Sequence, residues 1–224
     1  MAESIELVIF DCDGVLVDSE MLSAGVLMAM MAEAGLPITA EIFRSDFLGR
    51  SFASAAGRVA ERFGRPMPKE FQLNYRKRLL ARMETELQAM TGIETVLKAM
   101  RTPFCLATGS SPPRLELSLR VTGLQPYFEG RAYTASLVVN GKPAPDLYNY
   151  AAAQMGVAPD NCLVIEDSEM GVRAARAAHM TVWHFTGGAH IKSGYRLPHG
   201  LAVDRVVANM GELHQHFREE GLCS

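Results

Sequence analysis

Short apolar runs recur along the chain, each about the length of one buried strand. They are Ile5–Phe10, Phe104–Ala107, Cys162–Ile165 and Thr181–Phe185, with a further short strand predicted at Arg205–Val207. Segments with helical periodicity separate or follow the later runs, at Pro112–Val121, Pro145–Met155, Glu169–His179 and Gly211–Glu220. Strands that are apolar on both faces and alternate with helices are typical of a parallel sheet covered on two sides. The pattern therefore predicts an α/β fold with a doubly wound, mainly parallel core sheet.

One interval breaks this alternation, because residues 19–90 contain no convincing strand pattern. They contain helical patterns instead, at Glu20–Ala34, Ala40–Phe47, Phe52–Phe63 and Lys69–Ala89, divided by Gly- and Pro-containing turns. We therefore predict an all-helical domain at 18–90, inserted into a core formed by 1–17 and 91–224. Hinges are expected near 15–19 and 90–92.

A methionine stripe lies in the first of these helical patterns. It consists of Met21, Met28, Met30 and Met31. Such a stripe can line a greasy ligand cleft, but flexible methionines more often fill a hydrophobic core. We interpret it as core.

The composition narrows the function classes. The chain has 224 residues, of which 48% are hydrophobic and 21% charged, with a formal net charge of −3. These values are ordinary for a folded globular protein and give no support for a polyanion-binding surface. No apolar stretch reaches the roughly 18 residues of a membrane span, and no signal peptide pattern opens the chain. We expect neither a nucleic acid nor a membrane partner, and a monomer, with a dimer as the alternative.

The four cysteines are scattered and show no CxxC spacing. Cys12, Cys105 and Cys162 lie in or beside apolar runs, where cysteine usually acts as a small hydrophobic residue. This pattern indicates a reduced, cytoplasmic protein.

Polar groups follow the predicted strands at the points where they end. Asp11 and Asp13 follow the first strand, and the sequence Thr108-Gly109-Ser110 follows the second. Lys142 lies in a later Gly-Lys-Pro turn, and Glu166 and Asp167 follow the strand at 162–165. Each group alone has an ordinary explanation as a turn, a loop or a helix cap. Together they lie where open parallel sheets bind ligands, at the carboxyl ends of the strands.

Phosphoryl transfer is the chemistry that suits this set. Clustered carboxylates repel one another by roughly 4 kcal/mol per pair at 4 Å and an effective dielectric of about 20, so they need a cation. Ligands that are all oxygen favour Mg²⁺. Lys142 and Thr108 would hold phosphate oxygens. We predict Asp11 as the nucleophile that forms an aspartyl-phosphate, and Asp13 as the general acid and base.

Four segments of the sequence resemble the four motifs of the haloacid dehalogenase superfamily. They are FDCDGVLVDSE, FCLATGSS, GKPAPD and LVIEDSEMGVRAARAAHM, in this order along the chain. The resemblance is to the phosphatase and phosphomutase branch, whose Rossmann-like core carries a helical cap between the first two motifs. It implies catalytic roles for Asp11, Asp13, Thr108 and Lys142.

The resemblance also implies a set of binding residues. Mg²⁺ would be bound by Asp11, the backbone carbonyl of Asp13, Asp167 and, directly or through water, Glu166. The phosphate ester would contact Thr108, Gly109, Ser110 and Lys142. Candidate substrate contacts from the cap are Glu20, Arg50 and the basic run 74–78, although a solvated helix face is the alternative for most of that run.

Several details favour a phosphatase over other activities of the superfamily. Relatives that cleave carbon–halogen or phosphonate bonds lack an acid at the position of Asp13. The β-phosphoglucomutases carry a cap histidine twelve residues after the nucleophile, where this chain has Ser23. They also place an arginine at the end of a Gly-x-Ser-Arg cap turn, whereas this chain has Gly49-Arg50-Ser51-Phe52. We predict a hydrolase, with a β-phosphoglucomutase-like phosphotransferase as the alternative. The cap and the FTGGAH stretch are similar in style to sugar-phosphate phosphatases, including those that act on 6-phosphogluconate.

A receiver-like signalling module is a more distant alternative, because it too has an acidic Mg²⁺ pocket with a Thr or Ser and a Lys. Such modules carry no helical insertion after the first strand, so the interval 19–90 argues against this reading. We assign no catalytic role to His179, His184 or His190, which we interpret as packing or solvated residues.

Overall fold

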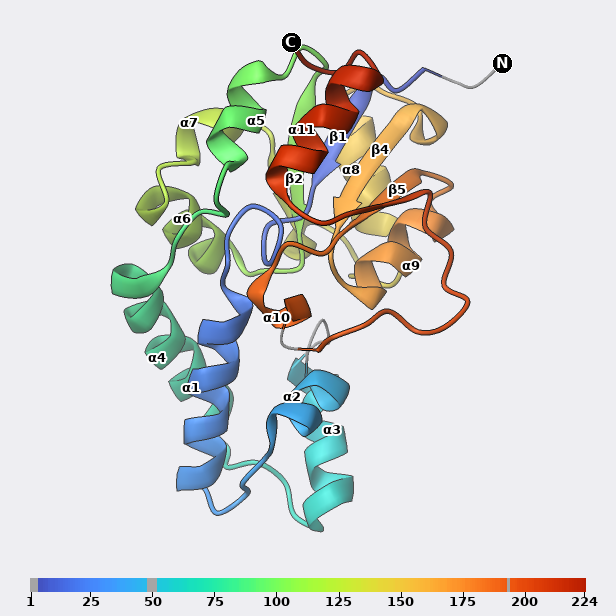
Figure 1. Cartoon of the computed structure of the whole chain (residues 1–224). Helices are drawn as coiled ribbons and strands as arrows, with labels where there is room; N and C mark the ends of the chain where they lie inside the picture. The colour runs from blue at the N-terminus through green and yellow to red at the C-terminus, as the bar shows by residue number, and fades with distance from the viewer. Residues whose placement is uncertain (1–3, 48–51, 193) are drawn as a thin grey trace.

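A six-stranded parallel sheet forms the centre of the protein in the computed structural model, which describes residues 4–47, 52–192 and 194–224 (Figure 1). The strand order is β3-β2-β1-β4-β5-β6. The strands are β1 (Leu7–Phe10), β2 (Phe104–Thr108), β3 (Ala132–Thr134), β4 (Cys162–Glu166), β5 (Thr181–Phe185) and β6 (Arg205–Val207). The predicted α/β fold with a parallel sheet is confirmed.

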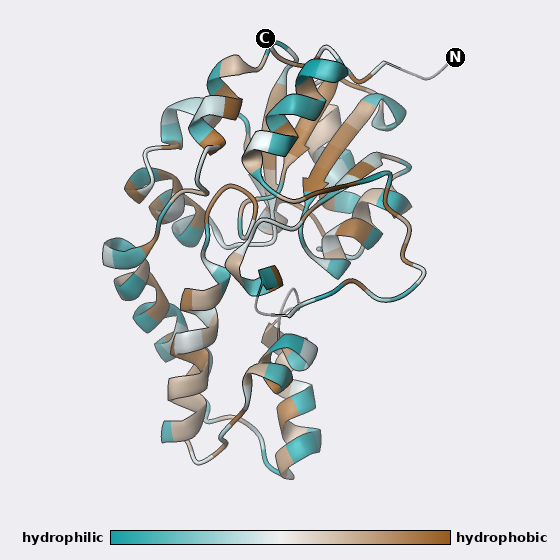
Figure 2. Cartoon of the chain, in the orientation of Figure 1, coloured by the Kyte–Doolittle hydropathy of each residue, from teal (hydrophilic) through white to brown (hydrophobic). Residues whose placement is uncertain are grey.

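The central strands are apolar because both of their faces are covered. All four residues of β1 are buried, and β1 pairs in parallel with β2 on one side and β4 on the other. Leu7 and Ile9 belong to one hydrophobic cluster, whereas Val8 and Phe10 belong to the other. This alternation is the two-residue period of a strand, and Figure 2 shows the strands as the most hydrophobic part of the core.

Helices cover both faces of the sheet. One face packs against α8 (Asp146–Gln154) and α9 (Glu169–Ala177). The helices α5 (Ile93–Ala99), α6 (Pro112–Val121), α7 (Gln125–Phe128) and α11 (Met210–Glu219) supply residues to the other hydrophobic cluster. Two 3₁₀ turns at 135–137 and 159–161, and the short α10 (Ala189–Lys192), complete this part of the chain.

Among the described residues, four helices follow β1, as the sequence predicts. They are α1 (Glu20–Glu33), α2 (Ala40–Asp46), α3 (Phe52–Phe63) and α4 (Phe71–Glu86). Figure 1 shows them gathered beyond one end of the sheet, on the side away from both chain termini. Met30 and Met31 are buried in their core, whereas Met21 is 47% exposed. None of the four methionines of the stripe is among the described residues that line the main cleft.

The two connections between the sheet and these helices run side by side. The amide of Asp18 donates to the carbonyl of Gln88 over 3.1 Å, and the amide of Met90 donates to the carbonyl of Leu16 over 2.8 Å. Val17 and Ala89 form an antiparallel bridge between them. The predicted hinge segments are therefore neighbours in space, and the division into two domains at these points stays a prediction.

Some elements differ from the expected ones. The predicted last helix of the insertion, at 69–89, is shorter at both ends, because the amide of Phe71 first closes a turn with Pro68 and because Leu87 is extended on its way to the bridge with Val17. Among the described residues, the helices α5, α7 and α10, the strand β3 and the two 3₁₀ turns were not predicted. In the part of the chain that the structure describes, no helix is long and apolar enough to cross a bilayer.

Candidate active site

The carboxyl ends of β1 and β4 bring three acidic side chains together. Asp11, Glu166 and Asp167 are all buried, and one carboxylate oxygen from each lies within 4.8 Å of the other two. Parallel pairing of β1 with β4 fixes this arrangement, because the amide of Asp11 donates to the carbonyl of Ile165 over 3.0 Å. Residues 155 positions apart in the chain thus face the same point.

The electrostatics of the trio favour a bound cation. Burial raises the pKa of the Asp11 carboxyl well above its usual range, and Glu166 and Asp167 raise it further against the opposing effect of Lys142. Burial, followed by Glu166, likewise raises the pKa of Asp167. Three carboxylates beside one lysine carry an excess of negative charge, and their oxygen donors fit a hard divalent cation such as Mg²⁺.

Lys142 lies between two of the three carboxylates. Its Nζ is 2.6 Å from Asp11 Oδ1 and 2.6 Å from Glu166 Oε1, and the side chain is 9% exposed. The phenol of Tyr148 donates to the same Glu166 oxygen over 3.1 Å, and the amide of Ser168 donates to the other oxygen over 2.7 Å. Burial would raise the pKa of Glu166, but Lys142 and Ser168 outweigh it and lower that pKa. Glu166 is thus held as a carboxylate.

Asp13 points its side chain to a different set of partners. Arg114 Nη2 lies 2.6 Å from Asp13 Oδ1, and the Ser110 hydroxyl donates to Oδ2 over 2.5 Å. The Ser19 hydroxyl donates to Oδ1 as well. Although burial opposes it, the Arg114 charge with these hydroxyls lowers the pKa of Asp13. The carboxyl is therefore ionised here and joins α6 to the start of α1.

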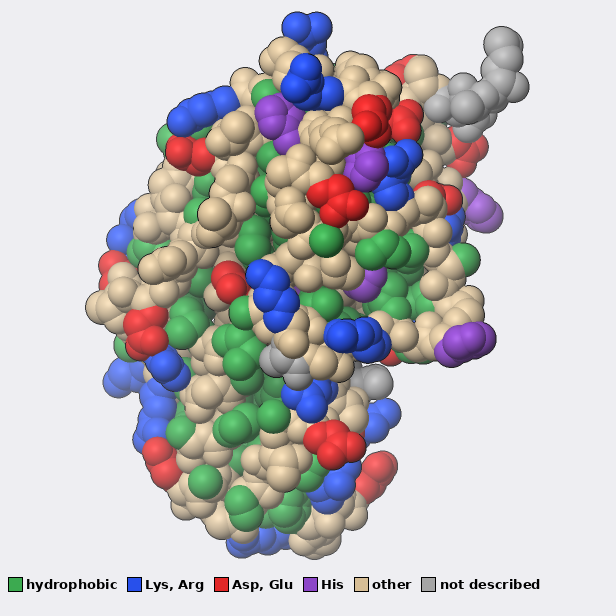
Figure 3. All heavy atoms as spheres, in the orientation of Figure 1, with side chains coloured by type: hydrophobic (Ala, Val, Ile, Leu, Met, Phe, Trp, Pro, Cys, Tyr) green, Lys and Arg blue, Asp and Glu red, His purple; other side chains and the backbone are tan. Residues whose placement is uncertain are grey.

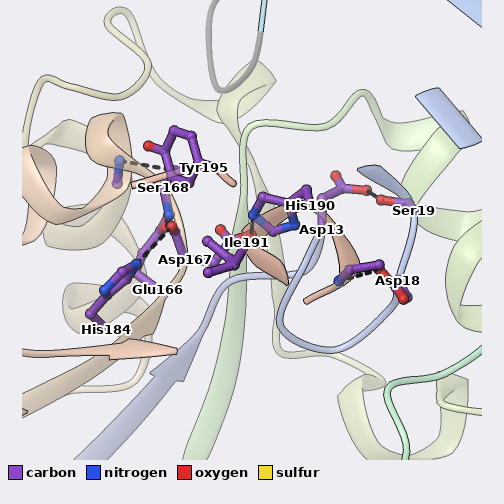
Figure 4. A network of polar contacts seen from close by, with 12 residues as sticks. Asp13, Asp18, Ser19, Glu166, Asp167, Ser168, His184, His190, Ile191 and Tyr195 are labelled. Carbon is purple, nitrogen blue, oxygen red and sulfur yellow. Dashed lines mark hydrogen bonds and ion pairs between the residues drawn. The ribbon is translucent and has the colours of Figure 1, made fainter. Parts of the chain in front are cut away.

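Asp167 is fixed by two histidines. His190 Nε2 lies 3.0 Å from Asp167 Oδ2, and His184 Nε2 lies 3.1 Å from the backbone oxygen of Asp167. Figure 4 shows Asp167 between His184 from β5 and His190 from α10, with Glu166 beside it on β4. Burial lowers the pKa of both imidazoles. Both histidines are buried, so the solvated reading does not apply to them.

Two glycines allow the chain to pass close to these carboxylates. Gly14 has φ +83°, and a Cβ atom there would overlap the carboxylate of Asp167. Gly171 lies in the first turn of α9, and a Cβ atom at this position would overlap the carboxylate of Glu166. Position 14 therefore requires glycine, both because of its backbone conformation and because a side chain there would have no space.

A cleft of about 800 Å³ contains most of the remaining predicted site residues. Its walls include Asp11, Asp13, Glu20, Thr108, Gly109, Ser110, Lys142, Glu166 and Asp167. Thr108 is buried at the end of β2, and its hydroxyl accepts a hydrogen bond from the Ser110 amide over 3.0 Å. Ser23 also lines the cleft. The predicted cap contact Arg50 lies outside the described residues.

Several residues that contact the acidic groups are not among the predicted site residues. Ser19, Arg114 and Tyr148 were not considered for the site, and His184 and His190 were interpreted only as packing or solvated residues. The FTGGAH stretch offered a signal for His190, because it follows β5 at the same edge of the sheet. Arg114 and Tyr148 lie within helical patterns, where nothing in the sequence distinguishes them from surface or core positions.

The model of the haloacid dehalogenase-like hydrolases matches residues 5–179 of this sequence. The chain belongs to this family. The match spans most of the chain and runs from β1 to the end of α9, so it includes all the acidic residues of the site. The resemblance drawn from the four motifs is thereby confirmed.

Several relatives of this hydrolase are named as phosphatases. The chain is 29% identical over 189 residues to the 6-phosphogluconate phosphatase of Escherichia coli, covering 84% of this chain and 86% of that protein. It is 34% identical over 182 residues to a probable pseudouridine-5'-phosphatase of Drosophila melanogaster, covering 78% of each. The prediction of a phosphoric monoester hydrolase is confirmed by the family and these relatives.

Solved structures of the family have the same fold. A haloacid dehalogenase-like protein of Agrobacterium tumefaciens has a TM-score of 0.83 and 33% identity, covering 97% of this chain and 100% of that one. A family hydrolase of Deinococcus radiodurans, solved with bound phosphate and sodium, has a TM-score of 0.79 and 34% identity, covering 100% of this chain and 99% of that one.

Proposed function

We propose that this hydrolase is a Mg²⁺-dependent phosphatase that releases phosphate from small phosphate monoesters through an aspartyl-phosphate on Asp11. The observation that carries the proposal is the buried group of Asp11, Glu166 and Asp167, with Lys142 2.6 Å from the first two. An acidic group of this kind accepts a phosphate dianion only when positive charge accompanies it. Lys142 supplies one such charge, and bound Mg²⁺ would supply the other and neutralise charge on the transferring phosphoryl group.

The roles of the chain's own groups follow from their positions. Asp11 directly follows β1 and lines the cleft, so its carboxylate can attack phosphorus while Lys142 holds a phosphate oxygen. Thr108, Gly109 and Ser110 precede the first turn of α6, where a hydroxyl and backbone amides can bind the remaining oxygens. We propose these residues as the phosphate contacts, and Glu20 as a contact from the insertion.

Asp13 would serve both halves of the reaction. Its ionised form, which Arg114 favours, accepts a proton from the water that cleaves the aspartyl-phosphate. In the first half the same carboxyl must donate a proton to the leaving alcohol. A phosphate dianion entering the cleft adds negative charge beside Asp13, and this raises the pKa of the carboxyl and favours the protonated form.

The names of relatives support sugar phosphates as the first compounds to test. They include phosphatases of 6-phosphogluconate, phosphorylated carbohydrates, fructose 1-phosphate and hexitol phosphates. The sequence expectation of a sugar phosphate or a phosphorylated sugar acid agrees with these names.

Steady-state phosphate release tests the proposal. The purified chain should release inorganic phosphate from p-nitrophenyl phosphate and from sugar phosphates with Mg²⁺, and EDTA should abolish release. Asp11→Asn should fold normally and lose essentially all turnover, whereas Asp160→Asn, an exposed aspartate outside the cleft, should keep wild-type rates. Retained turnover in Asp11→Asn would overturn the nucleophile.

The same assay separates the alternatives. A phosphotransferase would convert one sugar phosphate into another with little inorganic phosphate, which product analysis detects. A signalling module would stop after one phosphorylation per chain, whereas a phosphatase turns over repeatedly. Repeated release of stoichiometric inorganic phosphate and alcohol is the expected result.

A further inference from the structure

The cleft changes its chemical character along its length. At the sheet end its walls carry the carboxylates and Lys142. Toward the helices of the insertion, the described lining residues are mainly apolar: Leu27, Phe43, Phe47, Phe52, Ala55, Leu79 and Leu80. A ligand that spans the cleft would therefore meet a charged end and an apolar end.

Aromatic rings supply much of the apolar end. The rings of Phe43 and Phe47 have centroids 6.2 Å apart and planes only 5° apart. The rings of Phe52 and Tyr75 have centroids 6.4 Å apart and planes 31° apart. These pairs come from the region of α2 and from α3 and α4, so flat side chains reach the cleft from separate elements. Ring surfaces of this kind pack against flat apolar groups at similar separations.

Polar partners are fewer at this end. Among the described lining residues from α4, Gln72, Tyr75 and Arg76 carry polar atoms, whereas Leu79 and Leu80 do not. A linear polyol presents several hydroxyl groups, and each one that leaves water needs a new hydrogen-bond partner. Glu20 and Ser23 of α1 also line the cleft. Glu20 follows Ser19, whose hydroxyl donates to Asp13, and Ser23 accepts from Arg114 Nη2 over 3.3 Å, so these two lie with the polar groups around Asp13. The polar side chains left for the apolar end suit a ligand with one or two polar atoms there better than a fully hydroxylated chain.

The geometry points to a phosphate monoester whose leaving alcohol carries a flat apolar group, most simply an aromatic ring, remote from the phosphate. The phosphate occupies the sheet end beside Lys142, and the ring packs among Phe43, Phe47 and Phe52. This inference rests on the proposed phosphatase function and specifies its substrate class. The cleft of about 800 Å³ has room for such a molecule.

Matched substrates test the inference. The esters 2-phenylethyl phosphate and 4-phenylbutyl phosphate would be compared with glucitol 6-phosphate, because all three release a primary alcohol and differ mainly in the group that fills the cleft. We expect kcat/KM to be at least about tenfold higher for the better phenylalkyl ester, mostly through a lower KM. A wild-type preference for glucitol 6-phosphate would overturn the inference.

Two phenylalanines at opposite ends of α3 provide a matched pair of variants. Phe52 lines the cleft, whereas Phe63 is similarly half-buried but does not. Phe52→Ala should lower kcat/KM for the phenylalkyl ester about tenfold and change that for glucitol 6-phosphate by less than about threefold. Phe63→Ala should leave the ratio of the two values unchanged. Equal loss for both substrates in Phe52→Ala would contradict the inference.

The ratio also protects the test against poor folding, because both substrates are measured on one preparation. If Phe52→Ala does not fold, Leu80→Gln, at another half-buried cleft position, should shift the ratio in the same direction. A wild type that prefers glucitol 6-phosphate to the phenylalkyl ester can still release phosphate from p-nitrophenyl phosphate. If Asp11→Asn abolishes that release, the result supports the phosphatase function and overturns only the inference about the aromatic group. No release from any ester would overturn the proposed function, and the inference with it.

Discussion

Replacement of Lys142 by methionine tests how the acidic group is held together. At 2.6 Å and an effective dielectric of about 20, the Nζ charge attracts each of Asp11 and Glu166 by about 6 kcal/mol before desolvation is subtracted. Without it, two carboxylates within 4.8 Å of each other would repel by about 3.5 kcal/mol under the same assumption. Breaking a buried pair typically costs about 3–5 kcal/mol. We expect Lys142→Met to lose about that much free energy of unfolding in EDTA.

The same substitution should have the opposite effect on metal binding. Lys142 is a positive charge beside the proposed Mg²⁺ site, so its removal should tighten Mg²⁺ binding, by about tenfold or 1.4 kcal/mol. Mg²⁺ binding then stabilises the variant more than it stabilises the wild type. Saturating Mg²⁺ should therefore reduce the difference in free energy of unfolding between the two proteins. Catalysis should nevertheless fall by about 10²–10³ in kcat, because a phosphate contact is lost.

Urea unfolding with EDTA or Mg²⁺, together with calorimetric Mg²⁺ titration, measures all three effects. Lys98→Met is the control, because Lys98 is 63% exposed and its ion pair is with Glu94 on the same helix, over 3.3 Å. Such surface pairs contribute about 0–1 kcal/mol. Wild-type stability of Lys142→Met in EDTA, with unchanged Mg²⁺ affinity, would refute the bridging role of the lysine.

Further predictions concern the turn after β1 and the insertion. Gly14→Ala should weaken Mg²⁺ binding and abolish turnover, because its methyl group would displace Asp167 and because φ +83° is strained for alanine; wild-type Mg²⁺ affinity by calorimetry would contradict this. Asp46 is buried and bonds to Arg58 and Arg62, over 3.1 and 2.9 Å, so Asp46→Asn should cost roughly 1–3 kcal/mol at pH 7 by urea unfolding. Although burial opposes it, the arginines and Ser45 lower the pKa of Asp46 in the folded state. The contribution of the ionised Asp46 to the free energy of unfolding is therefore complete above the unfolded-state pKa of about 3.9, and it is lost as the pH falls through the folded-state pKa. The difference between wild type and Asp46→Asn should therefore shrink below pH 4, and a constant difference from pH 7 to pH 3 would exclude this ionic origin.

The ion pairs on the described surface are more exposed to solvent than the charged groups of the cleft. Figure 3 shows Lys and Arg side chains interspersed with Asp and Glu over the face drawn. Several ion pairs of the described surface, such as Arg78 with Glu33 and Arg82 with Glu86, are half-exposed. They contribute little individually, whereas the buried charges near Lys142 account for the sensitivity predicted above.

The sheet and the acidic residues at its edge were predictable because simple rules determine both. An apolar run such as Leu7–Phe10 needs cover on both faces, and parallel strands place Asp11, Glu166 and Asp167 at one edge whatever the details of packing. The short β3 was missed because Ala132-Tyr133-Thr134 forms no apolar run, whereas β6, which is equally short, contains two adjacent valines. The helix α5 was missed although Ile93, Val96 and Leu97 have helical spacing.

Partners of the acidic groups were less predictable. Arg114 lies 101 positions from Asp13 in the chain, and its choice of partner depends on how α6 packs against the start of α1. Tyr148 reaches Glu166 only because α8 packs on the sheet. The apolar end of the cleft is likewise a property of four helices together, because no single helix has a sequence that indicates which of its apolar residues remain open to a ligand.

The paired connections at 16–18 and 88–90 have a consequence for how such enzymes diversify. Because the chain leaves the sheet and returns to it through adjacent hydrogen-bonded segments, the ends of the inserted stretch lie next to each other. A stretch with adjacent ends can be exchanged for another of different length or composition without moving β1 or β2. A chimera that joins the insertion of a relative to this sheet at these two segments should therefore keep its chemistry and acquire the relative's preference among alcohols.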